Sequence, residues 1–185
     1  NNMRVQIIKS KAPIQIWSGY LNAPQSYRDE LVKVTKREKN KSPHIDSFYD
    51  VFNEKNGKVV ATNYYAWEAV PLYKKLLENI EKSINEWIDK PGKYKIQQAW
   101  SGVYEEGQQT NSHAHDPSTY SFCYYMRAEA PYTPMVFDDC GVEINGETDL
   151  LIVFPSFLKH SVPPCRNERV FISGNTIPTE FNVEG

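Results

Sequence analysis

The residues Leu150-Leu151-Ile152-Val153-Phe154 form a continuous apolar run, which Pro155-Ser156 and then His160 follow. A short run without polar residues is expected of a buried strand. Proline followed by serine turns the chain, so His160 begins the strand that returns. This segment therefore predicts β-structure in which a histidine opens a strand next to a buried one.

The chain around this run is divided into short strand-like segments from Lys93 onward, with Gly, Pro, Asn and Asp between them. Short strands at that spacing are typical of an all-β sandwich or barrel. The strands are predicted at about 94–104, 119–128, 134–138, 149–154, 159–163 and 169–177.

The N-terminal part combines strand-like and helical patterns. Residues 4–18 alternate apolar and polar side chains, as half-buried strands do. Residues 24–37 and 70–89 are predicted helices, because their apolar residues recur every three or four positions. Residues 38–47, which include His44, are rich in Lys, Asn, Ser and Pro and are expected to form a solvated loop.

Length and charge limit the kind of protein. A chain of 185 residues is expected to be one domain, in which a mixed part at about 1–92 supports a β core at about 93–178. The 21 Lys and Arg residues nearly balance 23 Asp and Glu residues, which disfavours nucleic acid as a partner. The apolar run at 150–154 is far too short to cross a membrane.

The cysteines and the amino terminus favour the cytoplasm. Cys123, Cys140 and Cys165 are an odd number, widely spaced and without a CxxC motif, which fits a reducing compartment. The first residues lack the apolar stretch of a secretory signal. We therefore expect a cytoplasmic protein without a membrane anchor.

Three of the four histidines form a candidate metal site. On a strand, His113 and His115 point to the same face, and His160 supplies a third imidazole from 45 residues downstream. Three ligands on one side of a metal leave the opposite positions open, which is the layout of a mononuclear non-heme iron site. The alternative is that these are ordinary surface or core histidines.

Either His115 or Asp116 could be the third ligand. On a regular strand Asp116 points away from His113, which favours His115 as the ligand. Pro117 restricts the backbone at Asp116 and can end strand pairing, so a turn could present the carboxylate instead. Charge mildly favours Asp116, because three neutral imidazoles leave Fe²⁺ uncompensated until an anion binds. Geometry favours His115.

A polar stripe is predicted on the last strand. Alternation places Arg169, Phe171, Ser173 and Asn175 on one face. Such a stripe is costly to bury without partners, and a carboxylate of a cosubstrate would satisfy the arginine. The alternative is a surface arginine on an edge strand, paired with Glu168 or Asp149.

These motifs occur in a fixed order that resembles one family. His113-Ala-His115-Asp116-Pro117, then Phe154-Pro155-Ser156, then His160, then Arg169 nine residues further on, resemble the 2-oxoglutarate/Fe(II)-dependent oxygenases. The chain is most similar to a group common in marine bacteria and their phages, which is distantly similar to prolyl hydroxylases. The motifs cover about residues 100–175.

The resemblance implies a fold, a cofactor and site residues. It implies a mainly β protein with supporting helices, built on a double-stranded β-helix, or jelly roll. It also implies Fe(II), 2-oxoglutarate and O₂ as reactants, release of succinate and CO₂, and hydroxylation of a protein side chain or a small molecule. If the chain is phage-encoded, the compartment is the host cytoplasm. The family pattern further implies cosubstrate contacts at Tyr124 and Tyr104, although both could equally be core residues.

The family pattern is not matched everywhere. Phe122 stands where glycine is common, and Gly174 stands where an aromatic or aliphatic residue is common. This exchange could reshape a substrate pocket. Two other functions fit the sequence: a cupin-like metalloenzyme that uses three histidines without 2-oxoglutarate, and a catalytically silent jelly-roll binding module.

Overall fold

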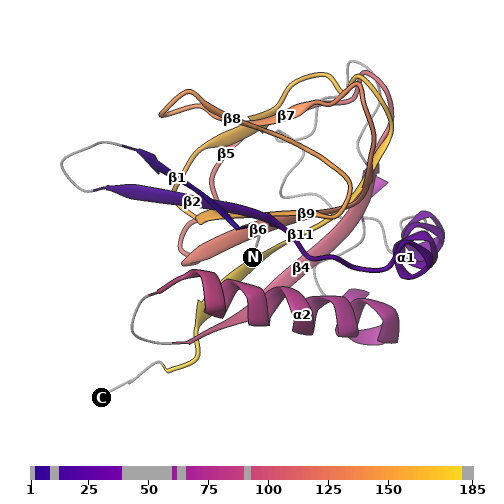
Figure 1. Cartoon of the computed structure of the whole chain (residues 1–185), viewed down its shortest axis with the longest axis horizontal. Coiled ribbons are helices and arrows are strands. Elements are labelled where there is room, and N and C mark those ends of the chain that lie inside the picture. The colour runs from indigo at the N-terminus through magenta and orange to yellow at the C-terminus, as the bar shows by residue number, and fades with distance from the viewer. Residues whose placement is uncertain (1–2, 9–12, 39–59, 62–65, 90–92, 181–185) are drawn as a thin grey trace.

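The computed structural model describes residues 3–8, 13–38, 60–61, 66–89 and 93–180. Two antiparallel β-sheets lie opposite each other, and helices cover the outer face of the larger one (Figure 1). The interior between the two sheets holds the candidate site. The predicted loop at 38–47 and His44 fall almost entirely outside the described residues.

The strand order is that of a jelly roll. The larger sheet has the order β1 (Arg4–Ile8), β2 (Ile14–Tyr20), β9 (Leu150–Pro155), β6 (Tyr120–Ala128), β11 (Arg169–Pro178), β4 (Tyr94–Tyr104), β3 (Val60–Ala61). The smaller sheet has the order β5 (Thr110–His113), β10 (His160–Val162), β7 (Pro134–Phe137), β8 (Val142–Asn145). From β4 to β11, every connection passes between the sheets except the β7–β8 hairpin. The strands β4 to β11 thus form the predicted jelly roll.

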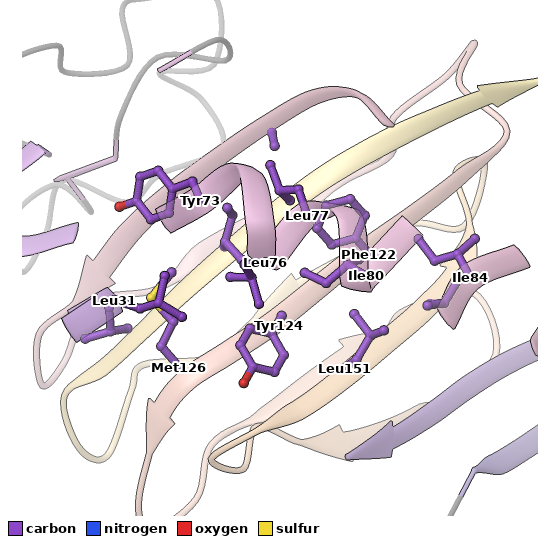
Figure 2. Close-up of a cluster of buried hydrophobic side chains, with 14 of the residues drawn as sticks. Leu31, Tyr73, Leu76, Leu77, Ile80, Ile84, Phe122, Tyr124, Met126 and Leu151 are labelled. Atoms are coloured by element: carbon purple, nitrogen blue, oxygen red, sulfur yellow. The ribbon is translucent and has the colours of Figure 1, made fainter. Parts of the chain in front are cut away.

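The helices pack against the outer face of the larger sheet. Helix α1 spans Gln25–Glu38, the short 3₁₀ helix η1 spans Ala66–Ala69, and α2 spans Pro71–Trp87. Pro71 begins α2, where its missing N–H costs nothing. The apolar face of α2 meets side chains of β6 and β9 in one buried core (Figure 2); among its members are Leu76, Ile80, Ile84, Phe122, Tyr124 and Leu151.

A second core lies between the sheets. Strand β9 is buried along its whole length, because its side chains alternate between the two cores. Leu151 and Val153 face the helices, and Leu150, Ile152 and Phe154 face the smaller sheet. The apolar run therefore has the predicted two-sided burial, with β9 beginning at Leu150. Asp149 precedes it in a left-handed turn at φ 69°.

Three short strands were not predicted from the sequence: the two-residue β3 and, within the jelly roll, β5 and β8. β5 reads Thr-Asn-Ser-His and β8 reads Val-Glu-Ile-Asn, and each has only four residues. β5 carries almost no apolar residues, so hydrophobic periodicity gives no signal for it. Pairing with β10 and β7 defines both strands.

The two departures from the family pattern are neighbours in space. Gly174 of β11 lies directly opposite Phe122 of β6. A Cβ at position 174 would approach the Phe122 ring to 2.5 Å, so only glycine fits beside the phenylalanine. Phe122 belongs to the helix-facing core. Phe122 and Gly174 therefore change the packing of the helix-facing core, and they do not border the site between the sheets.

Among the described helices, none combines the length and apolar character that crossing a bilayer requires.

Candidate metal centre

His113 and His160 are brought together by strand pairing. They lie directly opposite each other on the antiparallel strands β5 and β10. Directly opposed residues project from the same face, and the two ring centroids are 4.3 Å apart. His160 is only 4% exposed. The smaller sheet thus fixes two imidazoles side by side on its inner face.

His115 lies beyond the end of β5 and is positioned by the turn after β9. Its backbone N–H donates to the Ser156 carbonyl at 2.8 Å, and its own carbonyl accepts from the Ser118 N–H at 3.0 Å. These bonds bring the His115 Nε2 to 3.2 Å from the His160 Nε2. Pro155-Ser156 thus both turns the chain into β10 and holds the third histidine.

The three imidazoles have the spacing of a metal site. One ring nitrogen from each of His113, His115 and His160 lies within 4.8 Å of the others. Around an ion with bonds of about 2.1 Å, adjacent ligand nitrogens lie roughly 3.0–3.4 Å apart, so the 3.2 Å pair already has ligand separation.

Backbone carbonyls orient two of the rings. The His113 Nδ1–H donates to the Asn111 carbonyl at 2.8 Å, and the His160 Nδ1–H donates to the Leu158 carbonyl at 3.0 Å. A proton on Nδ1 leaves the Nε2 lone pair available. Such a bond from the second nitrogen is the usual partner of a metal-binding histidine.

The surroundings keep the imidazoles neutral. Burial lowers the pKa of His113, lowers that of His115 to about 3, and lowers that of His160 well below its ordinary value. A neutral imidazole is the form that binds a metal. The Trp100 ring lies 5.6 Å from His115 and the Phe154 ring 4.7 Å from His160, so apolar side chains border the cluster.

Two carboxylates near the cluster point elsewhere. Asp116 is exposed and is not among the converging side chains. Asp138 is also exposed, and it accepts hydrogen bonds from Ser112 and Ser161 at 2.8 and 2.9 Å. These serines are the chain neighbours of His113 and His160, so Asp138 ties β5 to β10 behind the two imidazoles.

Arg169 is the buried cation of the interior. It is 3% exposed, its Nη1 donates to the Thr133 carbonyl at 3.1 Å, and its Nε has no hydrogen-bond partner. The guanidinium lies over the rings of Tyr104 at 4.6 Å and Tyr125 at 5.0 Å. Within the part of the chain that the structure describes, no carboxylate pairs with it.

Gly146 makes room for this arginine. A Cβ at that position would come within 2.9 Å of both the Arg169 Nη1 and the Tyr125 ring. The β8–β9 connection therefore packs directly against the guanidinium.

Tyr125 lies beside the arginine, and Tyr124 does not. The Tyr124 phenol belongs to the helix-facing core and donates to the Asp149 carboxylate at 2.7 Å. The next residue, Tyr125, pairs with Phe171 and shares its face, and its buried hydroxyl has no partner. The structure therefore does not bring Tyr124 to the arginine, and Tyr125 lies there in its place. No local pattern distinguishes the two tyrosines, because the pairing of Phe171 with Tyr125 decides which one faces the arginine.

Of the other residues on the predicted inner face, Tyr104 and Ser173 lie on the same face as Arg169, whereas Asn175 is engaged by other side chains. Tyr104 lies opposite Arg169 in the register, and its hydroxyl bonds to Thr110 of β5. Ser173 lies opposite Trp100, so it is on the same inner face. Asn175 is satisfied by other side chains, because its Oδ1 accepts from Ser121 at 2.8 Å and its Nδ2 donates to Gln98 at 3.2 Å; Ser121 in turn bonds to Ser156.

The arginine and the histidines line one interior. Tyr104, against Arg169, and Trp100, against His115, are both inner-face residues of β4. They lie four residues apart, about 13 Å along the strand. Thr110 links the two ends, because it bonds to Tyr104 and shares β5 with His113.

The chain resembles solved oxygenases in fold. A viral collagen prolyl hydroxylase from Paramecium bursaria Chlorella virus-1, solved as a 2-oxoglutarate complex, superposes with a TM-score of 0.63 at 14% identity, covering 87% of this chain and 94% of that one. A Pseudomonas putida prolyl-4-hydroxylase gives 0.62 at 16% identity, covering 89% and 93%. HygX from Streptomyces hygroscopicus, with nickel and 2-oxoglutarate bound, gives 0.64 at 8% identity, covering 90% and 83%.

These likenesses define the fold class. The chain has the jelly-roll fold of prolyl hydroxylases and other 2-oxoglutarate-dependent oxygenases, which confirms the fold that the sequence resemblance implied. The sequence matches no protein-family model and no curated protein. At such low identities the likeness establishes fold alone, so the activity has to be inferred from the site.

Proposed function

We propose that this protein is a 2-oxoglutarate-dependent Fe(II) dioxygenase. The observation that supports it best is the combination, between the sheets of one jelly roll, of three converging imidazoles and a buried arginine with an unpartnered Nε. The imidazoles can bind a metal ion, and the arginine can bind a carboxylate. A small molecule with a metal-chelating end and a distal carboxylate could therefore bind to the metal and to the arginine at the same time.

His113, His115 and His160 would hold the iron. The donor set fits, because imidazole is a good ligand for first-row divalent metals and the Nδ1 atoms of two rings are already engaged by backbone carbonyls. The ligands come from one side, the smaller sheet and the turn beside it. Positions opposite them are left for a cosubstrate and O₂.

Arg169 would bind the distal carboxylate of 2-oxoglutarate. Its unpartnered Nε is a donor that the protein leaves unused, and the Tyr125 hydroxyl is a second one. A guanidinium and a phenol can together satisfy both oxygens of a carboxylate. Tyr104 would support the guanidinium through its ring, over which the guanidinium lies, and Ser173 would lie between the arginine and Trp100 on the inner face.

The protein residues supply binding, orientation and exclusion of water. When bound, Fe(II) and 2-oxoglutarate supply oxidative decarboxylation to succinate and CO₂ together with oxidation of the prime substrate. Trp100 and Phe154 border the imidazoles with apolar surface, which keeps bulk water from the reacting centre. We propose a protein side chain or a small molecule as the prime substrate, since the near-neutral charge offers no field for nucleic acid.

Anaerobic titration tests the proposal. Fe(II) is added to the metal-free protein with and without 2-oxoglutarate, and the visible absorption is recorded. We expect a metal-to-ligand charge-transfer band only when protein, Fe(II) and 2-oxoglutarate are all present. On admission of O₂, the band should decay and succinate should form.

The other outcomes favour the two alternatives. Iron that binds in a defined ratio without any response to 2-oxoglutarate would favour the cupin-like metalloenzyme. Protein that binds neither iron nor 2-oxoglutarate would favour the silent binding module. Arg169 speaks against the first, since that enzyme has no use for a buried guanidinium, and the converging triad speaks against the second.

The adjacent tyrosines offer a matched pair of substitutions. Tyr125→Phe is expected to weaken 2-oxoglutarate binding about tenfold, because it removes a donor to a charged group. Tyr124→Phe should leave that affinity unchanged and lower the free energy of unfolding by about 1–2 kcal/mol, because it removes a donor from the buried Asp149 carboxylate. Calorimetric titration and denaturant unfolding measure the two effects. Equal losses of affinity in both variants would contradict the assignment of Tyr125.

A further inference from the structure

The proposed centre contains positive charge and, among the described residues, no negative charge of its own. Its proposed metal-binding side chains are three imidazoles, which bind a metal in their uncharged form, and no Asp, Glu or Cys converges with them. Arg169 adds one buried positive charge without an ion pair. A divalent ion would therefore bring the total to three positive charges inside the jelly roll.

The nearest carboxylates offset this charge only weakly. Asp138 lies behind β5 and β10 on the exposed side, where water and the hydroxyls of Ser112 and Ser161 solvate it. Asp116 is exposed as well. Exposed charges interact weakly with buried ones because solvent screens them. Uncompensated charge in a buried site is costly.

A dianion that spans the interior removes two of the three charges. We propose that the all-imidazole ligand set makes metal binding depend on 2-oxoglutarate, so that the metal content of this protein follows the 2-oxoglutarate concentration. The inference rests on the proposed function and extends it to regulation of the site. Because such coupling is reciprocal, the metal raises 2-oxoglutarate affinity by the same factor.

His115 sets the strength of this coupling. It is the third of the converging imidazoles, and its ring nitrogen lies 3.2 Å from that of His160. An aspartate there would neutralise part of the metal charge and repel the incoming dianion. His115→Asp should therefore bind the metal more tightly when alone and gain less from 2-oxoglutarate.

The experiment measures metal binding, not turnover. Co(II), which is stable in air, is titrated calorimetrically into the metal-free full-length protein with and without saturating 2-oxoglutarate. The quantity compared is the factor by which 2-oxoglutarate raises the Co(II) affinity. We expect this factor to be at least about tenfold larger in the wild type than in His115→Asp.

Two controls separate charge from other effects. Asp116→Asn removes an exposed charge one residue away and should keep the wild-type factor. With 2-oxopentanoate, which keeps the chelating end but lacks the distal carboxylate, the factor in the wild type should be smaller than with 2-oxoglutarate. The reciprocal measurement, 2-oxoglutarate affinity of the wild type with and without Co(II), does not depend on whether the variant folds.

The outcomes are distinct. If 2-oxoglutarate binds and raises Co(II) affinity by equal factors in the wild type and in His115→Asp, the coupling inference is wrong and the proposed function stands. The inference is also wrong if Co(II) raises the 2-oxoglutarate affinity of the wild type by less than about fivefold. If 2-oxoglutarate binds to the wild type neither with nor without metal, the proposed function fails as well.

Discussion

Replacing His160 with alanine is expected to lower metal affinity by more than about a hundredfold and so to abolish iron binding at micromolar concentrations. Loss of a supporting partner alone typically costs 10- to 100-fold, and this change removes a ligand itself. The three rings form a triangle, because the His160 centroid lies 4.3 Å from that of His113 and 4.9 Å from that of His115, and these two are 4.7 Å apart. Calorimetric titration with Co(II) and iron analysis after anaerobic loading measure the loss.

The fold should survive this substitution. His160 packs against Phe154 and bonds to the Leu158 carbonyl, so its removal should cost about 1–3 kcal/mol of unfolding free energy. Circular dichroism checks that the sheets remain. Lys159→Ala, on the exposed neighbour, is the matched control and should bind metal normally. Unchanged iron stoichiometry in the folded His160 variant would refute the assignment of the triad.

The second large effect is expected at Arg169. Lysine at this position keeps the positive charge but loses the planar fork of donors, so Arg169→Lys should weaken 2-oxoglutarate binding about tenfold or more. Arg169→Ala should weaken it at least about a hundredfold, because a buried hydrogen-bonded charge pair typically contributes several kcal/mol. Co(II) affinity measured without 2-oxoglutarate should fall in neither variant, since the arginine is not among the converging ligands.

Thermal unfolding separates this role from a structural one. 2-Oxoglutarate with Co(II) should raise the Tm of the wild type, because a ligand that binds only the folded state stabilises it. The alanine variant should lose this increment even if its own Tm differs from that of the wild type. Ile80→Ala is a substitution in the helix-facing core, away from the site, and it should lower the Tm but keep the increment. Equal succinate formation by wild type and Arg169→Ala would assign the arginine to structure alone.

The strands that carry apolar periodicity could be read from the sequence. The run Leu150–Phe154 requires burial on both faces, and α2 shows its apolar stripe in every turn. For such segments the local pattern and the tertiary environment agree, because the pattern records which faces the fold will bury. The polar stripe that begins at Arg169 could be predicted for the same reason, because the alternation of side chains along one strand depends only on neighbouring residues.

The partners of the site residues could not be read in this way. The choice between Tyr124 and Tyr125 depends on which face of β6 meets Arg169, and strand pairing fixes that face. The exchange of Phe122 and Gly174 became intelligible only when β6 and β11 were seen side by side. Register between strands distant in sequence is set by the packed sheet.

The sequence by itself determined that this protein has two amphipathic helices, a series of short strands, three histidines in a metal-site pattern and an arginine on a polar stripe. The tertiary structure alone decided that His113 faces His160 across two short strands, that the turn at Ser156 carries His115 to them, and that Arg169 is buried without an ion pair. The physical reason is the distance along the chain over which each effect acts. Periodicity and turn preference depend on residues a few positions apart, whereas a metal site joins side chains that only the pairing of distant strands brings within ligand distance.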